Sequence, residues 1–219
     1  MQVRPDQAAG LRRRAAHGAR QPQRSIQIFS DSPDASLRLA HALHQAGQVL
    51  LLVDTQGRLF SASSPRSLFD WQHQLERRQL HTVPQAYGEG WYAPGVRADE
   101  PALSGMVNHY DYVMFDSGWG HTDLALLPGV AHRVVMEVRR TDQSMQHAYA
   151  VLKTLACGGG RFSVGLLGDR LACDHVRAAG CRFLEQRVAR AIFSVANEDD
   201  AFAALAVRMA DEETSLTAC

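Results

Sequence analysis

SIQIFSDSPDASLRLAHALHQAGQVLLLVD, residues 25–54, is the stretch that predicts the fold of this chain. Residues 25–30 have the composition of a strand, and residues 36–46 repeat small and apolar side chains at helical spacing. Residues 49–53 form a continuous apolar run, which is typical of a parallel strand covered on both faces. A strand, a helix and a second strand in this order predict a right-handed βαβ unit.

The same alternation of strand and helix patterns resumes in the second half of the chain. Turn residues interrupt the pattern between residues 56 and 109, where only residues 68–79 look helical. Strands are then expected at residues 112–115, 133–138, 162–167 and 191–195, with helices at 144–156, 176–189 and 199–210. We therefore expect one α/β domain over residues 25–219, with a mostly parallel sheet and helices on both faces.

The composition indicates a globular protein of a reducing compartment. The chain has 219 residues, of which 46% are hydrophobic, and 23 basic side chains balance 23 acidic ones, which excludes a disordered or globally polyanion-binding chain. Its four cysteines form no CxxC pair, which argues against a disulfide framework or a zinc ribbon. No apolar run approaches the roughly 20 residues that span a bilayer, so we expect a cytoplasmic protein without a strong membrane anchor.

Residues 1–24, here called the arm, differ in composition from the rest. They contain six arginines against the single acid Asp6 and little apolar surface, which predicts a flexible basic segment. A solvated tail and a weak, salt-dependent contact with nucleic acid or an anionic membrane are the alternatives. Because the whole chain has zero net charge, we expect no specific nucleic-acid binding.

Aspartates follow two of the expected strands. Asp54 comes directly after the apolar run at residues 49–53, and Asp116 comes after residues 112–115. Ligands of open α/β sheets bind beyond the carboxyl ends of the strands, where magnesium-nucleotide sites use acidic side chains. Turn formation or helix capping by aspartate is the ordinary alternative. Two such residues favour descent from a nucleotide-binding sheet.

The turn at residues 30–36 differs from a phosphate-binding P-loop. It has no glycine and no lysine, and Pro33 removes a backbone N–H donor. Asp31 and Asp34 would bring negative charge towards phosphate, at a cost of about 1–4 kcal/mol for each contact near 4 Å. Attraction by the helix dipole, about 0.3–1 kcal/mol, would not offset that cost. We therefore expect a degenerate P-loop without a catalytic residue or a metal.

Three segments carry a recognisable family pattern. They are residues 6–12 (DQAAGLR), residues 110–118 (YDYVMFDSG), and Thr141 followed by residues 147–153 (HAYAVLK). In this order they resemble the amino-terminal element, the Walker B strand and a later helix of the MinD/ParA-like ATPases with a deviant Walker motif. Within that family the flagellar number regulators FlhG, also called FleN, are the most similar. The resemblance implies a MinD-like fold of the SIMIBI P-loop class.

The chain departs from the family pattern around the nucleotide site. The family has a long glycine-rich loop with lysines after its first strand and a DxD switch after its second, whereas here Gln56 replaces the second acid of the switch. The resemblance thus implies a remnant nucleotide site, with Trp119 filling a vacated pocket. We expect a pseudo-ATPase that is not an enzyme and has no cofactor. The remnant site would consist of Asp31, Ser32, Pro33, Asp34, Asp54, Gln56 and Asp116.

The resemblance also implies a partner. In the family, the amino-terminal element resembles an activator of FlhF, the SRP-type GTPase that places flagella. The corresponding partner-binding residues here are Asp6, Gln7, Leu11 and Arg12. Other flagellar assembly proteins are further candidate partners, and a partner would recruit the chain to the cell pole. Two alternatives stay open: an active MinD/ParA-type ATPase with an unusual nucleotide site, and a related MinD-like factor of another secretion or cell-pole system.

Overall fold

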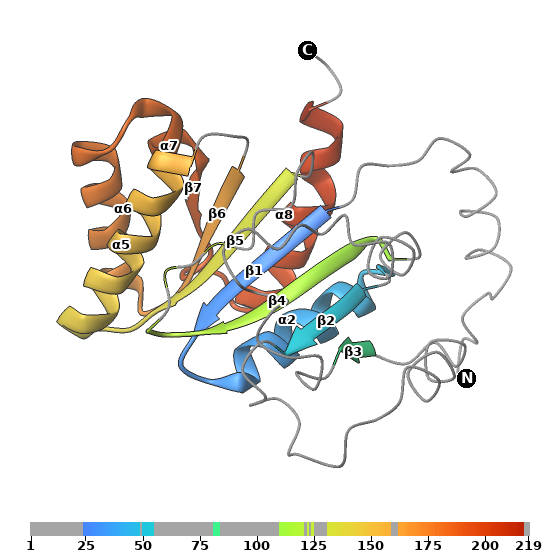
Figure 1. The fold of residues 1–219 in the computed structure, drawn as a ribbon. Coiled ribbons are helices and arrows are strands. Elements are labelled where there is room, and N and C mark those ends of the chain that lie inside the picture. The colour runs from blue at the N-terminus through green and yellow to red at the C-terminus, as the bar shows by residue number, and fades with distance from the viewer. Residues whose placement is uncertain are drawn as a thin grey trace, which may run out of the picture.

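The described part of the chain forms one sheet of parallel strands. A computed structural model describes residues 24–48, 50–54, 81–83, 110–120, 122, 124, 131–158 and 162–216. These residues contain a seven-stranded sheet with the order β3-β2-β4-β1-β5-β6-β7, in which every described pairing is parallel (Figure 1). The strands are β1 (Arg24–Ser30), β2 (Leu50–Asp54), β3 (His81–Val83), β4 (Tyr112–Gly118), β5 (Ala131–Val138), β6 (Phe162–Gly168) and β7 (Ile192–Ser194).

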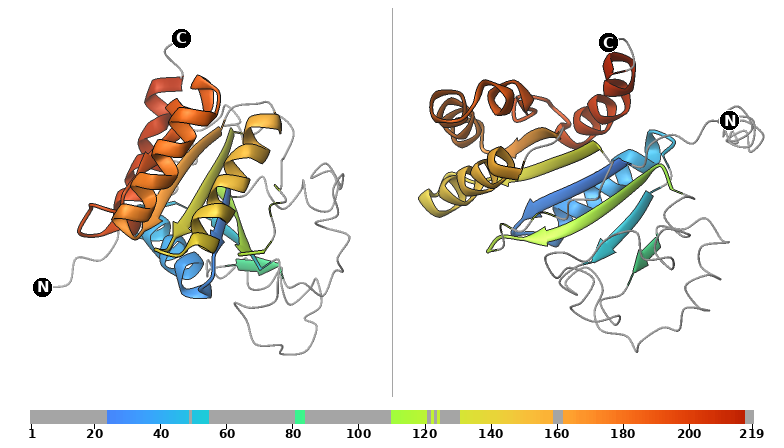
Figure 2. Two further views of the ribbon diagram at one scale, coloured as in Figure 1. Left: turned by 90° about the vertical axis from the view of Figure 1, so that its left-hand side faces the viewer. Right: turned by 45° about the horizontal axis from the view of Figure 1, so that its top comes forward.

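Helices cover both faces of this sheet. They are α2 (Pro33–Gln45), α5 (Asp142–Gly158), α6 (Arg170–Phe183), α7 (Gln186–Ala191) and α8 (Ala201–Leu216). Helices α2 and α8 contribute to the hydrophobic cluster on one face, and α5, α6 and α7 contribute to the cluster on the other (Figure 2). The structure therefore confirms the expected α/β class with a parallel sheet between two helical layers. No helix in these ranges has the length and apolar character that a membrane span requires.

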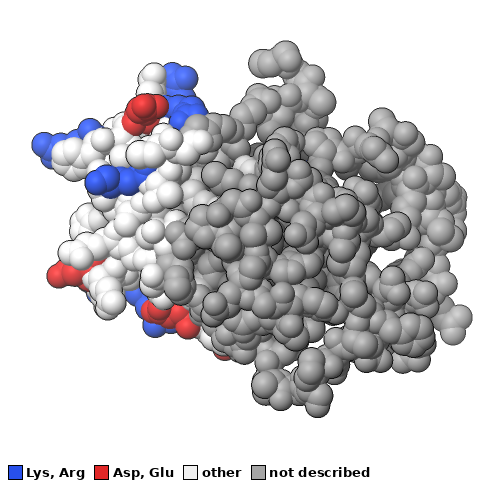
Figure 3. All heavy atoms as spheres, viewed as in Figure 1, with Lys and Arg blue, Asp and Glu red and all other residues white. Residues whose placement is uncertain are grey.

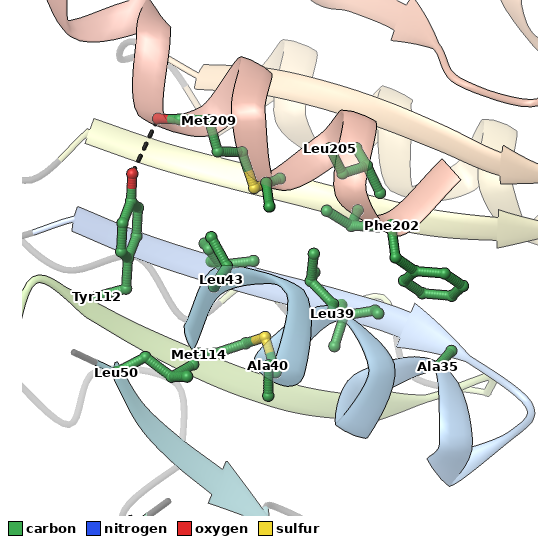
Figure 4. Packing of buried hydrophobic residues seen from close by; sticks show 14 of the residues in the cluster. Ala35, Leu39, Ala40, Leu43, Leu50, Tyr112, Met114, Phe202, Leu205 and Met209 are labelled. Carbon is green, nitrogen blue, oxygen red and sulfur yellow. Dashed lines mark hydrogen bonds between the residues drawn. The ribbon is translucent and has the colours of Figure 1, made fainter. Parts of the chain in front are cut away.

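The cluster beneath α2 and α8 shows why the helical spacing of residues 36–46 predicts a buried face. Leu39 and Leu43 of α2 are fully buried against the sheet and beside Leu205 of α8 (Figure 4). Each fully buried side chain of this size contributes about 1.5–3 kcal/mol. The hydroxyl of Tyr112 donates a 2.8 Å hydrogen bond to the Met209 carbonyl, which joins β4 to α8 on the same face.

A tight turn between β6 and α6 sets where the next helix begins. Gly168 has φ = 110°, and a Cβ at this position would lie 2.4 Å from the Val138 carbonyl oxygen. The following residue, Asp169, caps α6 because its carboxylate accepts a 2.9 Å hydrogen bond from the Ala172 amide. Helix α6 therefore starts at Arg170.

The helices and strands differ from the expected ones at α6–α7, at β3 and at the start of β1. The single helix expected at residues 176–189 is wrong, because Leu184 is extended and separates α6 from α7. Strand β3 lies between residues 56 and 109, where turn residues interrupt the sequence pattern and no strand was expected. Strand β1 includes Arg24, whereas the rest of the arm and the expected helix at residues 68–79 lie outside the described residues.

Candidate functional site

The strand order brings the carboxyl ends of four strands to one edge of the sheet. Strand β1 lies between β4 and β5, and its Ile28 is in register with both Asp116 and Val135. Strand β2 lies on the other side of β4 and pairs Asp54 directly with Asp116. The two aspartates expected after strand ends are therefore neighbours, but β4 continues to Gly118, so Asp116 lies within this strand and not after it. Gln56, which replaces the second acid of the family's DxD switch, lies outside the described residues.

Asp116 is fully buried at this edge and has a hydroxyl partner. The side chain of Ser36, one turn into α2 and also fully buried, donates a hydrogen bond to Asp116 Oδ1. Sequence reasoning missed Ser36 as a site residue. A signal for it existed, since P-loops place the Ser or Thr that binds magnesium early in the helix after the first strand.

A second hydroxyl–carboxylate contact joins the carboxyl ends of β1 and β5. Ser30, the last residue of β1, is fully buried and donates to Glu137 Oε2 of β5. Its Oγ also accepts a 3.0 Å hydrogen bond from the Ser32 amide. Sequence reasoning missed this pair as well. No local pattern indicates it, because the two residues are 107 positions apart and meet only through the order of the strands.

The residues between β1 and α2 form a short cap. Only Asp31 and Ser32 connect the strand to the helix, and the Ser32 side chain accepts a 3.2 Å hydrogen bond from the Asp34 amide. Pro33 occupies the first turn, where its missing N–H costs nothing, and Asp34 is exposed at the positive end of the helix dipole.

Asp31 at the same turn forms a surface ion pair. Its Oδ2 lies 3.2 Å from Arg139 Nη1, and the two side chains are 43% and 47% exposed. The pair ties the β1–α2 turn to the segment after β5. Arg139 was not among the residues singled out from the sequence.

Trp119, for which a pocket-filling role was expected, lies on the α5 side of the sheet. Its ring packs edge-on against His147 of α5, with 4.3 Å between the ring centroids, and it contacts the cluster on the α5 side of the sheet. Asp116 points to the opposite face, where Ser36 of α2 contacts it. The two side chains therefore belong to different faces of the sheet, and the filling of a vacated pocket by Trp119 stays a prediction.

The opposite, amino edge of the sheet carries buried arginines. Arg24 Nη1 donates a 3.0 Å hydrogen bond to the Tyr112 hydroxyl, and the guanidinium groups of Arg24 and Arg133 lie 5.3 and 5.6 Å from the centroid of the Tyr112 ring. Both arginines are buried. Burial also raises the pKa of Tyr110, which lies just before β4.

The described residues contain no group of three or more His, Cys, Asp or Glu side chains arranged to hold a metal. The thiol of Cys173 is buried in the cluster under α5 and α6, and burial raises its pKa to about 12. Neither observation adds a ligand to the carboxyl edge. The Ser36–Asp116 and Ser30–Glu137 contacts therefore define the candidate site.

No family model and no curated protein matches this sequence. Two solved structures are similar to it. One is a ParA family ATPase from Chlorobium tepidum TLS, with 17% identity and a TM-score of 0.46, where the match covers 86% of this chain and 98% of the other. The second is the MinC:MinD cell division protein complex of Aquifex aeolicus, with 15% identity and a TM-score of 0.48 over 87% of this chain and 89% of the matched chain.

These comparisons correct one expectation. The sequence suggested a pseudo-ATPase that is not an enzyme, but the ParA family structure is that of an ATPase. The expectation of a non-enzyme is therefore contradicted. What the chain has in common with both structures is the α/β fold.

Proposed function

We propose that this chain is a MinD/ParA-like regulator of flagellar number or placement that binds an SRP-type GTPase of the FlhF kind through its arm. The observation that carries the proposal is the attachment of the arm to the sheet. Arg24, where the arm enters β1, is buried and bonds to Tyr112 within the segment at residues 110–118 that resembles the family. The arm is thus joined to the sheet at a fixed point.

The third segment of the resemblance, residues 147–153, also packs near the strand that the arm precedes. Residues 147–153 belong to α5, and His147 contacts both Trp119, just after β4, and Phe29 of β1. The ring centroids of Phe29 and His147 are 6.0 Å apart. Two of the three segments that resemble the family, residues 110–118 and 147–153, therefore pack around β1, the strand that the arm precedes.

The spacing within the arm suits a partner helix. Gln7 and Leu11 are four residues apart, which places them on one face if the element is helical on its partner. In that form Asp6 would cap the helix, and Arg12 or Gln7 would act near the GTPase site. Eleven residues separate Arg12 from Arg24, and an extended chain of that length reaches at most about 40 Å. The element can thus engage a partner away from the sheet.

A GTPase assay with purified FlhF tests this function. Leu11→Asp in the full chain is expected to abolish capture of FlhF and stimulation of its GTP hydrolysis, because it places a charge on the apolar contact of the element. Arg20→Ala, in the same arm but outside the element, should leave both unchanged. Binding and stimulation by Leu11→Asp at the level of the unchanged chain would overturn the proposal.

A second function, a MinD/ParA-type ATPase with an unusual nucleotide site, is favoured by the Ser36–Asp116 contact. A serine hydroxyl and an aspartate carboxylate are the oxygen donors that magnesium takes in P-loop sites, so these two side chains fit that ion. The phosphates would lie at the β1–α2 turn. The amides of Ser32, Asp34 and Ala35 donate hydrogen bonds of 3.0–3.2 Å within this turn, so a bound phosphate would have to compete with these acceptors.

Calorimetry with magnesium and ATP tests this second function. Saturable binding that weakens at least about tenfold in Asp116→Asn, and not in the control Ser163→Ala, is the expected result. Absence of binding heat, or equal binding by Asp116→Asn, would overturn it without bearing on the FlhF experiment.

A further inference from the structure

The carboxyl end of α6 and helix α7 carry exposed arginines and an exposed aromatic ring. These residues, Arg182, Phe183, Arg187 and Arg190, are called here the α6–α7 surface; all four side chains are exposed. Residues 177–191 contain four arginines and a single acid, Glu185. Figure 3 shows basic side chains gathered at the upper left, where α6 and α7 lie in the same view of Figure 1.

The high exposure of the Phe183 side chain is not explained by packing within the described part of the chain. The side chain is 65% exposed, more than any other large apolar residue in the described ranges. The guanidinium of Arg182 lies 5.3 Å from the centroid of its ring, so a cation covers one part of an otherwise exposed aromatic face. Burial of such a ring against a partner is favourable, and aromatic and arginine side chains are enriched at protein interfaces.

Two arginines of this surface, Arg182 and Arg190, stand apart from the ion pairs of the described residues. Among the described residues the ion pairs involve Arg139 and Arg208, and neither Arg182 nor Arg190 takes part in one. Arg187 is held in place, since its Nη2 lies 3.4 Å from the Ala156 carbonyl and its guanidinium is 5.5 Å from the centroid of the Phe162 ring. Among residues 177–191, the acidic side chain is the exposed carboxylate of Glu185. The surface is therefore net positive.

We propose that the α6–α7 surface binds an acidic peptide segment of a protein partner, with an apolar side chain of that segment against Phe183. Arginine forks bind carboxylates in a bidentate manner, and the exposed ring supplies an apolar contact. An acidic peptide suits this surface better than nucleic acid does. Nucleic-acid binding needs a long basic groove, whereas here Glu185 interrupts the charge and the chain as a whole is neutral. The inference is independent of the arm and its partner.

Fluorescence anisotropy with a defined probe tests the proposal. The probe is a fluorescein-labelled peptide of Glu and Asp residues with one central Phe, titrated with the full chain at about 0.15 M salt. Arg182→Glu combined with Arg190→Glu is expected to weaken binding at least about tenfold, and Phe183→Ser about threefold or more. Because these side chains are exposed, the melting temperature should change little.

The matched control separates this surface from the arm, which is also rich in arginine. Arg13→Glu combined with Arg14→Glu changes the net charge by the same amount and should leave the affinity for the probe unchanged. Leu11→Asp, which tests the proposed function, should also bind the probe normally. Equal losses in the two double variants, no binding by the unchanged chain, or stronger competition by an oligodeoxythymidylate than by unlabelled peptide would each overturn the proposal.

Discussion

The two edges of the sheet hold buried charges of opposite sign. At the carboxyl edge, Asp116 is fully buried and receives the Ser36 hydroxyl. At the amino edge, Arg24 is buried, bonds to the Tyr112 hydroxyl and lies over its ring. Carboxylates thus meet small hydroxyl groups at one edge, whereas guanidinium groups meet an aromatic ring at the other.

The topology accounts for this difference. In a parallel sheet with helical crossovers, helices begin at the carboxyl edge and end at the amino edge, so positive dipole ends gather at the first and negative ones at the second. Asp116 therefore meets the first turn of α2, whereas Arg182 and Arg190 stand in the last turns of α6 and α7. The charges near the ends of α2, α6 and α7 thus match the dipole ends at each edge, whereas α5 carries no basic side chain in its last turn.

The largest expected effect is at the amino edge. Tyr112→Leu should lower the free energy of unfolding by about 3–5 kcal/mol, because it removes a fully buried ring and the oxygen to which Arg24 donates. Urea denaturation followed by circular dichroism measures the change. Tyr112→Phe is the companion variant, since it keeps the ring and should lose only about 1–2 kcal/mol. Equal losses in the two variants would show that the ring contributes nothing beyond the hydroxyl.

At the carboxyl edge the expected effect is smaller. Ser36→Ala should cost about 1–3 kcal/mol of unfolding free energy, because buried Asp116 loses this hydrogen-bond donor. Ser163→Ala in the half-buried part of β6 is the control and should stay within about 0.5 kcal/mol. If both variants unfold at the same urea concentration as the unchanged chain, the Ser36–Asp116 contact does not stabilise the edge.

Alkaline pH should weaken the fold through the amino edge. Burial holds the pKa of Tyr110 above its ordinary value of 10.0, so the unfolded chain loses this proton first and stability falls as pH rises above about 10. The contribution is at most about 1.4 kcal/mol for each pH unit. Thermal unfolding from pH 9 to about 11 should therefore show a shallower decline in Tyr110→Phe. An identical decline in both chains would contradict this assignment.

The ion pair of the β1–α2 turn should have the smallest effect. Arg139→Gln removes the partner of Asp31, and because both side chains are nearly half exposed, the expected loss is about 0–1 kcal/mol. The loss should disappear in roughly 1 M salt, where surface charges are screened. A loss that persists in high salt would mean that Arg139 has a structural role beyond this pair.

Local patterns in the sequence determined the fold class. Apolar runs such as residues 49–53 and the helical repeat at residues 36–46 depend only on neighbouring side chains, and the structure confirms both as β2 and α2 with shifts of one to three residues at their ends. The position of Asp54 at the end of β2 was likewise visible in the sequence, whereas β4 continues two residues beyond Asp116. The break between α6 and α7 was not visible in the sequence, because Leu184 carries no helix-stopping signal of its own.

Tertiary structure alone decided what surrounds those aspartates. The partner of Asp116 is 80 residues away in sequence, and the partner of Ser30 is 107 residues away. Such contacts depend on β1 lying between β4 and β5, and side-chain periodicity carries no information on strand order. The sequence by itself thus placed two aspartates near the carboxyl ends of their strands, and the order of the strands decided which charges and hydroxyl groups meet there.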